Sequence, residues 1–147
     1  MKNKTCCFAG HRKIPKNDYQ LIQARLESKL VYLINEGVTY FKAGGKLGFD
    51  TMAALAVLNL KQAFPHIRLI LSLPVKSQIK LWIDDDIKIY VHILAQADMI
   101  VFRKQSRHLI NGSRFCLCYL TDAESVTAYT VEYAKQKRLR IINIAFA

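Results

Sequence analysis

Short apolar runs alternate along the chain with longer stretches in which apolar residues recur at helical spacing. The short runs predict β-strands, and the longer stretches predict amphipathic helices. The predicted strands cover residues 5–9, 38–42, 67–73, 99–102, 115–120 and 140–144. The predicted helices cover residues 18–36, 50–63, 126–137 and a part of 78–95, and a short basic helix or turn is predicted over 104–112.

This alternation of strands and helices predicts an α/β fold. The most apolar strand, residues 67–73 (IRLILSL), is typical of a parallel strand that is covered on both faces. We therefore expect a Rossmann-like, doubly wound, mostly parallel sheet with right-handed crossovers and helices on both faces. Because no linker, repeat or low-complexity segment interrupts the pattern, residues 1–147 are predicted to form a single domain.

The composition agrees with a packed protein that prefers anionic partners. Hydrophobic residues make up 52% of the chain and charged residues 22%, which favours a globular core over disorder. The 22 Lys and Arg residues against 11 Asp and Glu residues give a formal net charge of +11. This excess attracts nucleotides, nucleic acids or acidic membrane surfaces, and it does not choose among them.

The compartment is predicted from the apolar runs and the cysteines. No apolar run approaches the roughly 20 residues that span a bilayer, and Cys6–Ala9 is too short for a secretory signal, so a cytoplasmic location is expected. Cys6 and Cys7 should point to opposite faces of a strand, whereas Cys116 and Cys118 should share one. These spacings favour buried free thiols over a metal site or a disulfide.

Candidate binding residues follow the predicted strands, because parallel sheets bind ligands beyond the carboxyl ends of their strands. Gly10, His11 and Arg12 follow the first strand, and Arg12 offers a planar fork for phosphate. The loop after the second strand contains Gly44, Gly45, Lys46 and Gly48. Three glycines between a strand and a helix predict a nest of backbone N–H groups that could hold a phosphate.

Other polar residues near these strand ends have more than one interpretation. Asp50 is expected first as a helix N-cap and second as a hydrogen-bond acceptor for a ligand hydroxyl. Lys76 and a capping Ser77 follow the third strand, and the Ser and Thr residues of 121–127 either cap a helix or meet a ligand. A basic cluster without acidic residues follows the fourth strand: Arg103, Lys104, Arg107, His108 and Arg114.

Two further features have structural explanations. Asp84, Asp85 and Asp86 are neighbours that cannot converge on one ion if they are helical, so they predict a helix start or a solvated face. Trp82 beside them is expected to pack against the protein.

Three sequence blocks resemble the SLOG family of Rossmann-like proteins, in particular its small, single-domain bacterial branch. The blocks are CCFAGHR at 6–12, FKAGGKLGFD at 41–50 and AYTVEYA at 128–134. The resemblance covers nearly the whole chain and implies that a nucleotide or nucleotide-derived ligand binds in the pocket described above. The residues that it implicates are Gly10, His11, Arg12, Gly44, Gly45, Gly48 and Asp50, with Thr127 on the far wall.

Two related families imply other functions. The DNA-processing protein A family has a similar Gly-x-Arg loop and Ser-Gly-x-Ala-x-Gly-Ile-Asp block, and binds single-stranded DNA. The LOG phosphoribohydrolases cleave nucleoside monophosphates with a Pro-Gly-Gly-x-Gly-Thr-x-x-Glu motif. The corresponding residues 123–130 lack the paired glycines, and Thr130 stands where the catalytic Glu would be. Hydrolysis by the LOG mechanism is therefore not expected.

These observations leave one leading hypothesis and two alternatives. The leading hypothesis is a sensor or regulatory domain without catalysis that binds a phosphorylated, nucleotide-like ligand, whose charge Arg12 and either Lys76 or Arg107 neutralise. The first alternative is single-stranded nucleic-acid binding, with bases stacked on Phe49, Trp82 or Tyr119, although core packing is favoured for each. The second is a weak nucleotide hydrolase with His11, Asp50 or Glu124 as acid or base. A homodimer is an option, since such folds often pair through an apolar helix face.

Overall fold

The computed structural model describes residues 2–74, 81–103 and 107–146. In these residues one sheet contains β1 (Thr5–Gly10), β2 (Tyr40–Ala43), β3 (Arg68–Pro74), β4 (Met99–Arg103), β5 (Phe115–Tyr119) and β6 (Arg140–Asn143). The strands are all parallel, in the order β4-β3-β2-β1-β5-β6. The predicted Rossmann-like α/β fold is confirmed.

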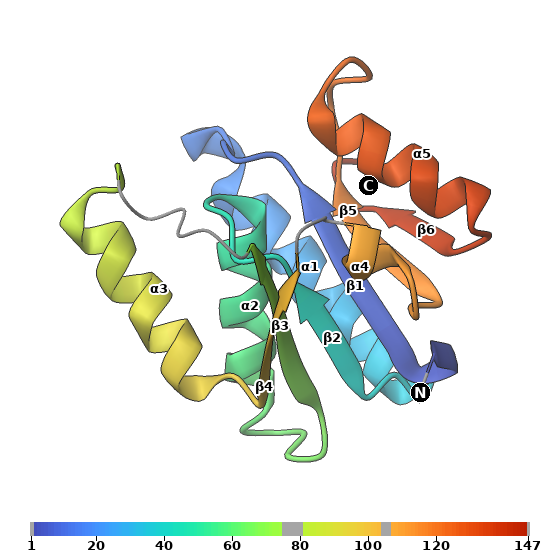
Figure 1. Cartoon of the computed structure of the whole chain (residues 1–147), viewed down its shortest axis with the longest axis horizontal. Helices are drawn as coiled ribbons and strands as arrows, with labels where there is room; N and C mark the ends of the chain where they lie inside the picture. Colours follow the sequence, from blue (N-terminus) through green and yellow to red (C-terminus); the bar gives the residue numbers. More distant parts are fainter. Residues whose placement is uncertain (1, 75–80, 104–106, 147) are drawn as a thin grey trace.

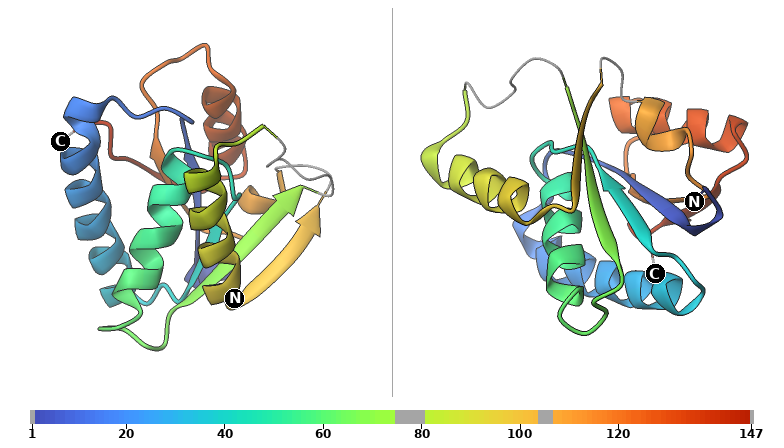
Figure 2. Two further views of the ribbon diagram at one scale, coloured as in Figure 1. Left: turned by 90° about the vertical axis from the view of Figure 1, so that its left-hand side faces the viewer. Right: turned by 60° about the horizontal axis from the view of Figure 1, so that its bottom comes forward.

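Helices cover both faces of this sheet (Figures 1 and 2). They are α1 (Tyr19–Asn35), α2 (Phe49–Leu60), α3 (Asp84–Gln96), α4 (Arg107–Ile110) and α5 (Val126–Gln136), with short 3-10 helices at Lys2–Lys4 and Lys16–Asp18. The first three contribute to one apolar cluster, and α4 and α5 contribute to the other. None of these described helices combines the length and hydrophobicity that a membrane crossing needs.

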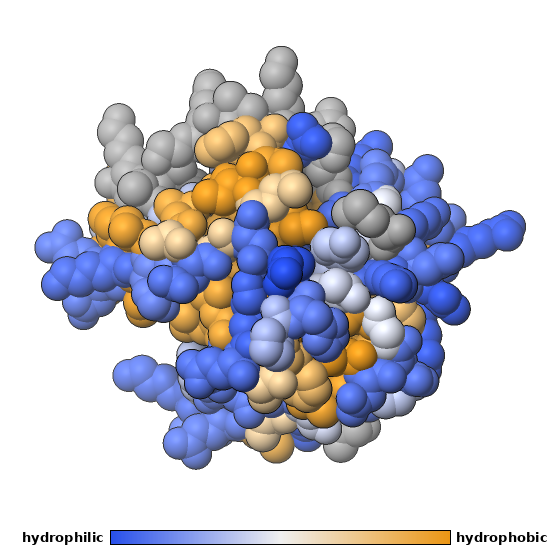
Figure 3. All heavy atoms as spheres, turned by 90° about the horizontal axis from the view of Figure 1, so that it is seen from below, coloured by the Kyte–Doolittle hydropathy of each residue, from blue (hydrophilic) through white to orange (hydrophobic). Residues whose placement is uncertain are grey.

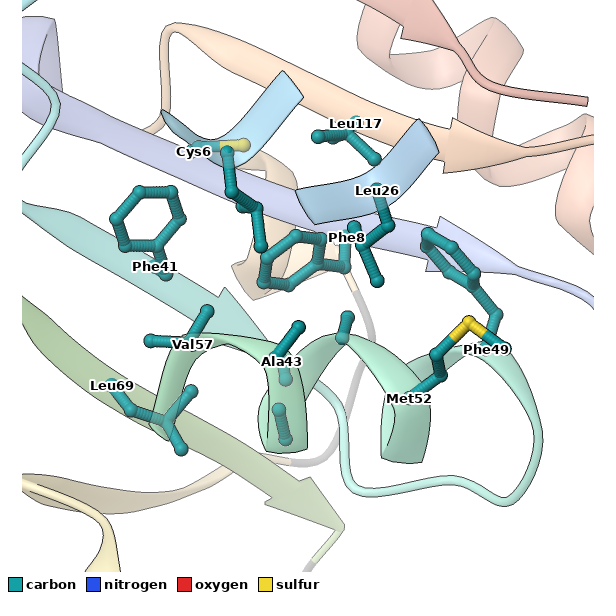
Figure 4. Packing of buried hydrophobic residues seen from close by; sticks show 14 of the residues in the cluster. Cys6, Phe8, Leu26, Phe41, Ala43, Phe49, Met52, Val57, Leu69 and Leu117 are labelled. Carbon is teal, nitrogen blue, oxygen red and sulfur yellow. The ribbon is translucent and has the colours of Figure 1, made fainter. Parts of the chain in front are cut away.

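The alternation of side chains along β1 separates the two apolar clusters. Cys6 and Phe8 belong to the larger cluster under α1 and α2, where Phe8 stacks on Phe41 with ring centroids 6.1 Å apart (Figure 4). Cys7 belongs to the smaller cluster with Cys116 and Cys118. All four cysteines are free and buried, so the predicted faces and the core interpretation of the thiols are confirmed.

Helix α3 begins later than residue 78, where the stretch that predicted it starts. Helix α3 starts at Asp84, and Asp84, Asp85 and Asp86 form its first turn, as the helix-start interpretation expects. Acidic groups favour this end because the helix dipole is positive there. The ring of Trp82 packs edge-on against Tyr90 with centroids 5.2 Å apart, which confirms its packing role.

The chain crosses from one side of the sheet to the other after β4. From β1 to β4 each strand is added outward on one side, and β5 then pairs with the opposite side of β1. The strand order therefore reverses between β1 and β5. In a parallel sheet, a crevice forms at the carboxyl ends of the strands near such a reversal.

Candidate functional site

A pocket of about 150 Å³ opens at the carboxyl ends of the strands. Its walls come from the ends of β1, β3 and β4, from the loop after β2, and from helices α2, α4 and α5. The residues that line it are Phe8, Ala9, Gly10, Gly44, Lys46, Asp50, Ser72, Leu73, Pro74, Arg103, Leu109, Val126, Thr127 and Thr130. The pocket thus lies where the topology of the sheet predicts a ligand site.

Asp50 is the buried charged group of this pocket. Its side chain is only 7% exposed, and its Oδ2 atom accepts a hydrogen bond of 3.3 Å from the backbone N–H of Lys46. Burial raises the pKa of the Asp50 carboxyl to about 6, although that hydrogen bond and the charges of Lys46 and Arg12 act in the opposite direction. Asp50 can therefore change its charge close to neutral pH.

The expected capping role of Asp50 is wrong. The N-cap of α2 is Gly48, whose φ of 82° places it in the left-handed region, and Asp50 lies inside the first turn. From there its carboxylate reaches back to the Lys46 amide, while the Thr51 hydroxyl donates to the Lys46 carbonyl at 3.0 Å. The first turn of α2 thus holds the preceding loop in place.

The predicted nest of backbone N–H groups is already partly occupied. The Lys46 amide donates to Asp50, and the Phe49 amide donates to the carbonyl of His11 at 3.1 Å. These two amides are therefore directed at the protein, because each has an internal acceptor. Positive charge in the pocket comes from the side chains of Lys46 and Arg103.

Two of the predicted glycines allow close contacts between protein segments. A Cβ atom on Gly10 would overlap the side chain of Phe49, and one on Gly48 would overlap the backbone of Arg12. Glycine is needed at these positions so that the first two strand-end loops can pack together. Gly10 and Gly44 also line the pocket, whereas Gly45, with a φ of 77°, is not among the described lining residues.

His11 connects two strand-end loops. Its Nε2 atom accepts a hydrogen bond of 2.9 Å from the backbone N–H of Thr121, and its ring meets Tyr119 edge-on. An accepting Nε2 places the ring proton on Nδ1 in this arrangement. Within the described residues, neither His11 nor Glu124 lines the pocket, so Asp50 is the acid–base candidate that does.

Arg12 lies beside the pocket. It lines a small hollow together with Lys46, Leu47 and Trp82, and a second, open one on its other side that includes Lys13 and Gly48. Since Lys46 lines both the first hollow and the main pocket, the two spaces are neighbours. Phe49 and Tyr119 are buried, so the core interpretation holds for them, whereas Trp82 is half-buried.

The basic residues after the fourth strand do not form one cluster. Arg103 lines the pocket, but the guanidinium of Arg107 lies 4.9 Å from the ring centre of Tyr133. Arg114 precedes β5 and bonds through its amide to the carbonyl of Thr5, at the amino ends of the strands. Lys76, Ser77 and Lys104 lie outside the described residues.

The segment after the fifth strand caps a helix, as one of its two interpretations predicted, and it also reaches the pocket. The Ser125 hydroxyl caps α5 by accepting a hydrogen bond of 3.2 Å from the Ala128 amide, and Thr127 lines the pocket. Sequence analysis named Arg103 in the basic cluster after the fourth strand, but it did not name Ser72 or Thr130 as candidate binding residues. Thr130 could have been found, because it lies one helical turn after Thr127.

Comparisons with known proteins agree with the resemblance in the sequence. The model of the YspA SLOG family matches residues 10–145. A UPF0398 protein of Bacillus pumilus is 32% identical over 145 residues, covering 82% of this chain and 78% of that protein.

Two other relatives are similar to most of the chain. A UPF0398 protein of Halalkalibacterium halodurans is 31% identical over 130 residues, covering 80% of this chain and 69% of its own length. The uncharacterised SPbeta prophage-derived protein YoqJ of Bacillus subtilis is 28% identical over 142 residues, covering 78% of this chain and 83% of YoqJ. With this fold and these matches, the chain belongs to the YspA SLOG family.

Proposed function

We propose that the pocket binds a phosphorylated, nucleotide-like ligand and that the protein acts as a sensor or regulatory domain without catalysis of its own. One observation carries this proposal: the pocket combines two cationic side chains, Lys46 and Arg103, with the buried carboxyl group of Asp50. A phosphate group is held by positive charge, and sugar hydroxyls are held by a hydrogen-bond acceptor. The pocket offers both.

The phosphate is held by charge. Lys46 and Arg103 supply the positive side chains, and the first turn of α5 lies at the same pocket through Val126 and Thr127. The N-terminus of a helix of this length attracts anions, because its free N–H groups and dipole are positive there. Arg12 adds positive charge from the neighbouring hollow.

The sugar and base use the remaining walls. An ionised Asp50 accepts hydrogen bonds from ribose hydroxyls, which is the second of the two roles considered for it. Phe8, Leu73 and Leu109 give the pocket apolar surface that suits the face of a base. Phosphate contacts supply affinity without identifying the base, so the proposal names a ligand class.

A ligand panel tests the proposal. Calorimetric titrations and thermal shifts with AMP, ADP, ATP, cyclic AMP and ADP-ribose should show binding of at least one of them. Lys46→Gln and Arg103→Gln should each weaken binding about tenfold or more, as expected for a lost charge-assisted contact. Lys29→Gln, at an exposed position of α1, is the matched control and should leave the affinity unchanged. If no compound binds, the proposal is wrong.

Asp50→Asn separates the sugar from the phosphate. We expect this variant to bind the best nucleotide about tenfold more weakly, because the amide replaces two acceptor oxygens with one. Binding of inorganic pyrophosphate should stay equal or become tighter, because a negative charge is removed. Equal weakening of both compounds would contradict the assignment of Asp50 to the sugar.

The pH dependence of stability tests the raised pKa of the Asp50 carboxyl. Its folded pKa of about 6 exceeds the ordinary value of 3.8, so the folded protein binds more protons between these values. Stability therefore falls as the pH rises from about 4 to about 6. Asp50→Asn should remove this slope and stabilise the protein at pH 7.5 by at most about 3 kcal/mol. Thermal melts from pH 4.5 to 8, with the exposed Asp85→Asn as control, measure the difference.

A second candidate function is binding of single-stranded nucleic acid. The hollow beside the pocket favours it, because Arg12 and Lys46 lie there next to the half-buried ring of Trp82. Such binding weakens steeply with salt as counterions are released. A gel shift with single-stranded oligonucleotides at low and high salt, repeated with Trp82→Leu, distinguishes it from binding of a small ligand in the pocket.

A further inference from the structure

The strands start at the edge of the sheet opposite the pocket, and exposed cations stand there in a row. The backbone amide of Arg114 donates a hydrogen bond to the carbonyl of Thr5 at 3.0 Å, and the amide of Arg140 donates to the carbonyl of Arg114 at 2.8 Å. Lys4 directly precedes Thr5. The exposed residues Lys4, Arg114 and Arg140 therefore lie side by side at the starts of β1, β5 and β6.

The segments before β1 and β6 add further cations to this row. Lys2 belongs with Lys4 to the 3-10 helix before β1. Lys137 and Arg138 lie between the end of α5 and the start of β6. The exposed cations of these segments form the amino-end patch: Lys2, Lys4, Arg114, Lys137, Arg138 and Arg140. Figure 3 views the molecule from below Figure 1, and hydrophilic side chains project from its right-hand side, where β6 and α5 lie in Figure 1.

Acidic side chains do not neutralise the amino-end patch. Its cations lie in three stretches of sequence without Asp or Glu: residues 1–17, 99–121 and 133–147. Over the described residues, the ion pair of the structure joins Lys61 to Asp98 at 2.7 Å, before β4 and three strands away from β1. Glu36 at the end of α1 and Glu132 in α5 are exposed and form no such pair. The patch therefore keeps its concentrated positive charge.

Arg138 has a backbone conformation that arginine rarely adopts. Its φ of 65° lies in the left-handed region, and among the described residues it is the non-glycine residue with a positive φ. The position directly after a helix often has this conformation and is usually glycine there, because a Cβ atom is unfavourable in it. Glycine would therefore suit the fold better, which indicates that the cationic side chain of Arg138 serves another purpose.

The spacing of the row matches the spacing of phosphates in a nucleic acid. Neighbouring strands of a sheet lie about 4.8 Å apart, so a row of three cations on β1, β5 and β6 spans about 10 Å. One strand of B-form DNA has a phosphate every 3.4 Å or so along the helix axis. About three successive phosphates therefore fit the length of the row.

The aromatic rings at the patch are covered by its cations. The guanidinium of Arg114 lies 5.4 Å from the ring centre of Phe115, and Nζ of Lys137 lies 5.5 Å from that of Tyr133. Proteins that bind single strands stack the bases on exposed aromatic rings, and stable membrane binding needs an apolar anchor in addition to charge. At the described strand starts, the large apolar side chain that is exposed is Met99, three strands away from β1. The patch therefore suits neither a single strand nor a membrane.

We propose that the amino-end patch binds the phosphate backbone of duplex DNA without reading its sequence. The bases of a duplex are already stacked on one another, so the protein needs to supply only positive charge. The patch and the pocket lie at opposite edges of the sheet, so a bound duplex leaves the pocket open. The proposal does not depend on what the pocket binds.

The salt dependence of binding tests the proposal. Fluorescence anisotropy with a labelled duplex of about 20 base pairs should show binding at low salt, with a dissociation constant of about 100 μM or tighter. Contacts with about four phosphates predict a loss of affinity of about a hundredfold between about 50 and about 200 mM salt. A protein that does not bind the duplex at low salt overturns the proposal.

Two substitutions locate the contact. Arg138→Gly and Arg114→Gln should each weaken duplex binding about threefold or more and reduce the salt slope by about one. Glycine adopts the backbone conformation of residue 138 without strain, so thermal melts of Arg138→Gly should show no loss of stability. Lys88→Gln, at an exposed position of α3, removes the same charge and is the matched control. If all three variants weaken binding equally, net charge explains the binding and the proposal is wrong.

Two further comparisons identify the partner. Trp82→Leu should leave duplex binding unchanged, because Trp82 lies in the hollow beside the pocket. A duplex affinity that Trp82→Leu lowers and Arg138→Gly does not would place the contact at that hollow and contradict the proposal. Vesicles that contain phosphatidylserine test a membrane surface. If Arg138→Gly releases the protein from these vesicles and leaves duplex binding unchanged, the patch binds lipid and the proposal fails.

Discussion

The two edge strands of the sheet both have apolar residues in their middle, but their surroundings differ. At one edge, β6 has the sequence RIIN, and its isoleucines are half-buried between α5 and the larger core cluster. At the other edge, β4 has the sequence MIVFR and exposes Met99, Ile100 and Phe102. Both strands have an apolar middle, so this feature does not explain why the side chains of β6 are half-buried and those of β4 exposed.

Side-chain hydrogen bonds fasten the carboxyl end of β6. The Asn143 side chain accepts from the Leu120 and Ala145 amides and donates to the Leu120 carbonyl, over 3.0 to 3.2 Å. The Arg25 guanidinium donates to the carbonyls of Ile144 and Ala145. These bonds satisfy backbone groups just after β5 and β6. Among the described residues beside β4, Asp98 at the start of the strand accepts from the backbone amide of Leu69. The carboxyl end of β6 is thus fastened by polar side chains, whereas β4 is fastened at its amino end.

Of the substitutions at the two edge strands, Asn143→Ala should lower the free energy of unfolding most. The substitution removes three hydrogen bonds and leaves backbone groups of Leu120 and Ala145 without partners. We expect a loss of about 2 to 3 kcal/mol in the free energy of unfolding. Urea denaturation measures it, and Asn59→Ala, at an exposed position of α2, is the control. Equal stabilities of the two variants would show that Asn143 does not fasten the end of β6.

Asp98→Ala should have the next largest effect, at the β4 edge. Burial raises the pKa of Asp98, but its hydrogen bonds with Lys61 and the Leu69 amide outweigh burial and lower the pKa overall. We expect a loss of about 1 to 2 kcal/mol at pH 7. A lowered carboxyl pKa stabilises the fold above its ordinary value of 3.8 and loses this effect as the pH falls through the folded pKa. The difference from wild type should therefore vanish in strong acid, and a constant difference would contradict this.

Arg25→Gln should weaken the β6 edge less. The shorter amide side chain does not reach the carbonyls of Ile144 and Ala145, but water can replace the guanidinium at this half-buried position. The expected loss is about 1 kcal/mol. Chemical denaturation alongside Lys29→Gln, four residues later on the exposed side of α1, gives the comparison. A larger loss than in Asn143→Ala would reverse the ranking of the two contacts.

Phe102→Ser should have the smallest effect on the stability of a single chain. Its ring is mostly exposed, so the substitution should change the free energy of unfolding of the dilute protein by less than about 1 kcal/mol. Urea denaturation of the variant and the wild-type protein at low concentration measures the difference. A large loss in the dilute protein would mean that the β4 edge is packed after all.

Much of the fold could be predicted from the sequence, because its information is local. Strand and helix positions follow from the spacing of apolar residues, and the carboxyl ends of the strands indicate where a pocket opens. Gly10, Gly44, Lys46, Asp50 and Thr127 were selected in this way and line the pocket. The faces of the cysteines follow from the two-residue period of a strand.

Other features depend on contacts between distant segments. Gly48 was expected to serve a phosphate, but its place against the backbone of Arg12 depends on how two loops pack. Asp50 was expected to cap α2, but its burial depends on the loop that precedes the helix. Arg103 and Arg114 belong to one basic stretch of the sequence, but Arg103 lies at the carboxyl ends of the strands and Arg114 at their amino ends.

By itself, the sequence determined the class of the fold, its elements and the edge at which the pocket opens, because periodicity and turn residues act over a few positions. The tertiary structure decided which edge strand exposes its apolar side chains, which carboxyl group is buried and which cationic residues line the pocket. Strand order and burial arise from contacts across the whole chain, and the hydrophobicity of a strand does not specify which elements will lie beside it. The apolar residues of MIVFR and RIIN are alike, and their places in the sheet leave the former exposed and the latter half-buried.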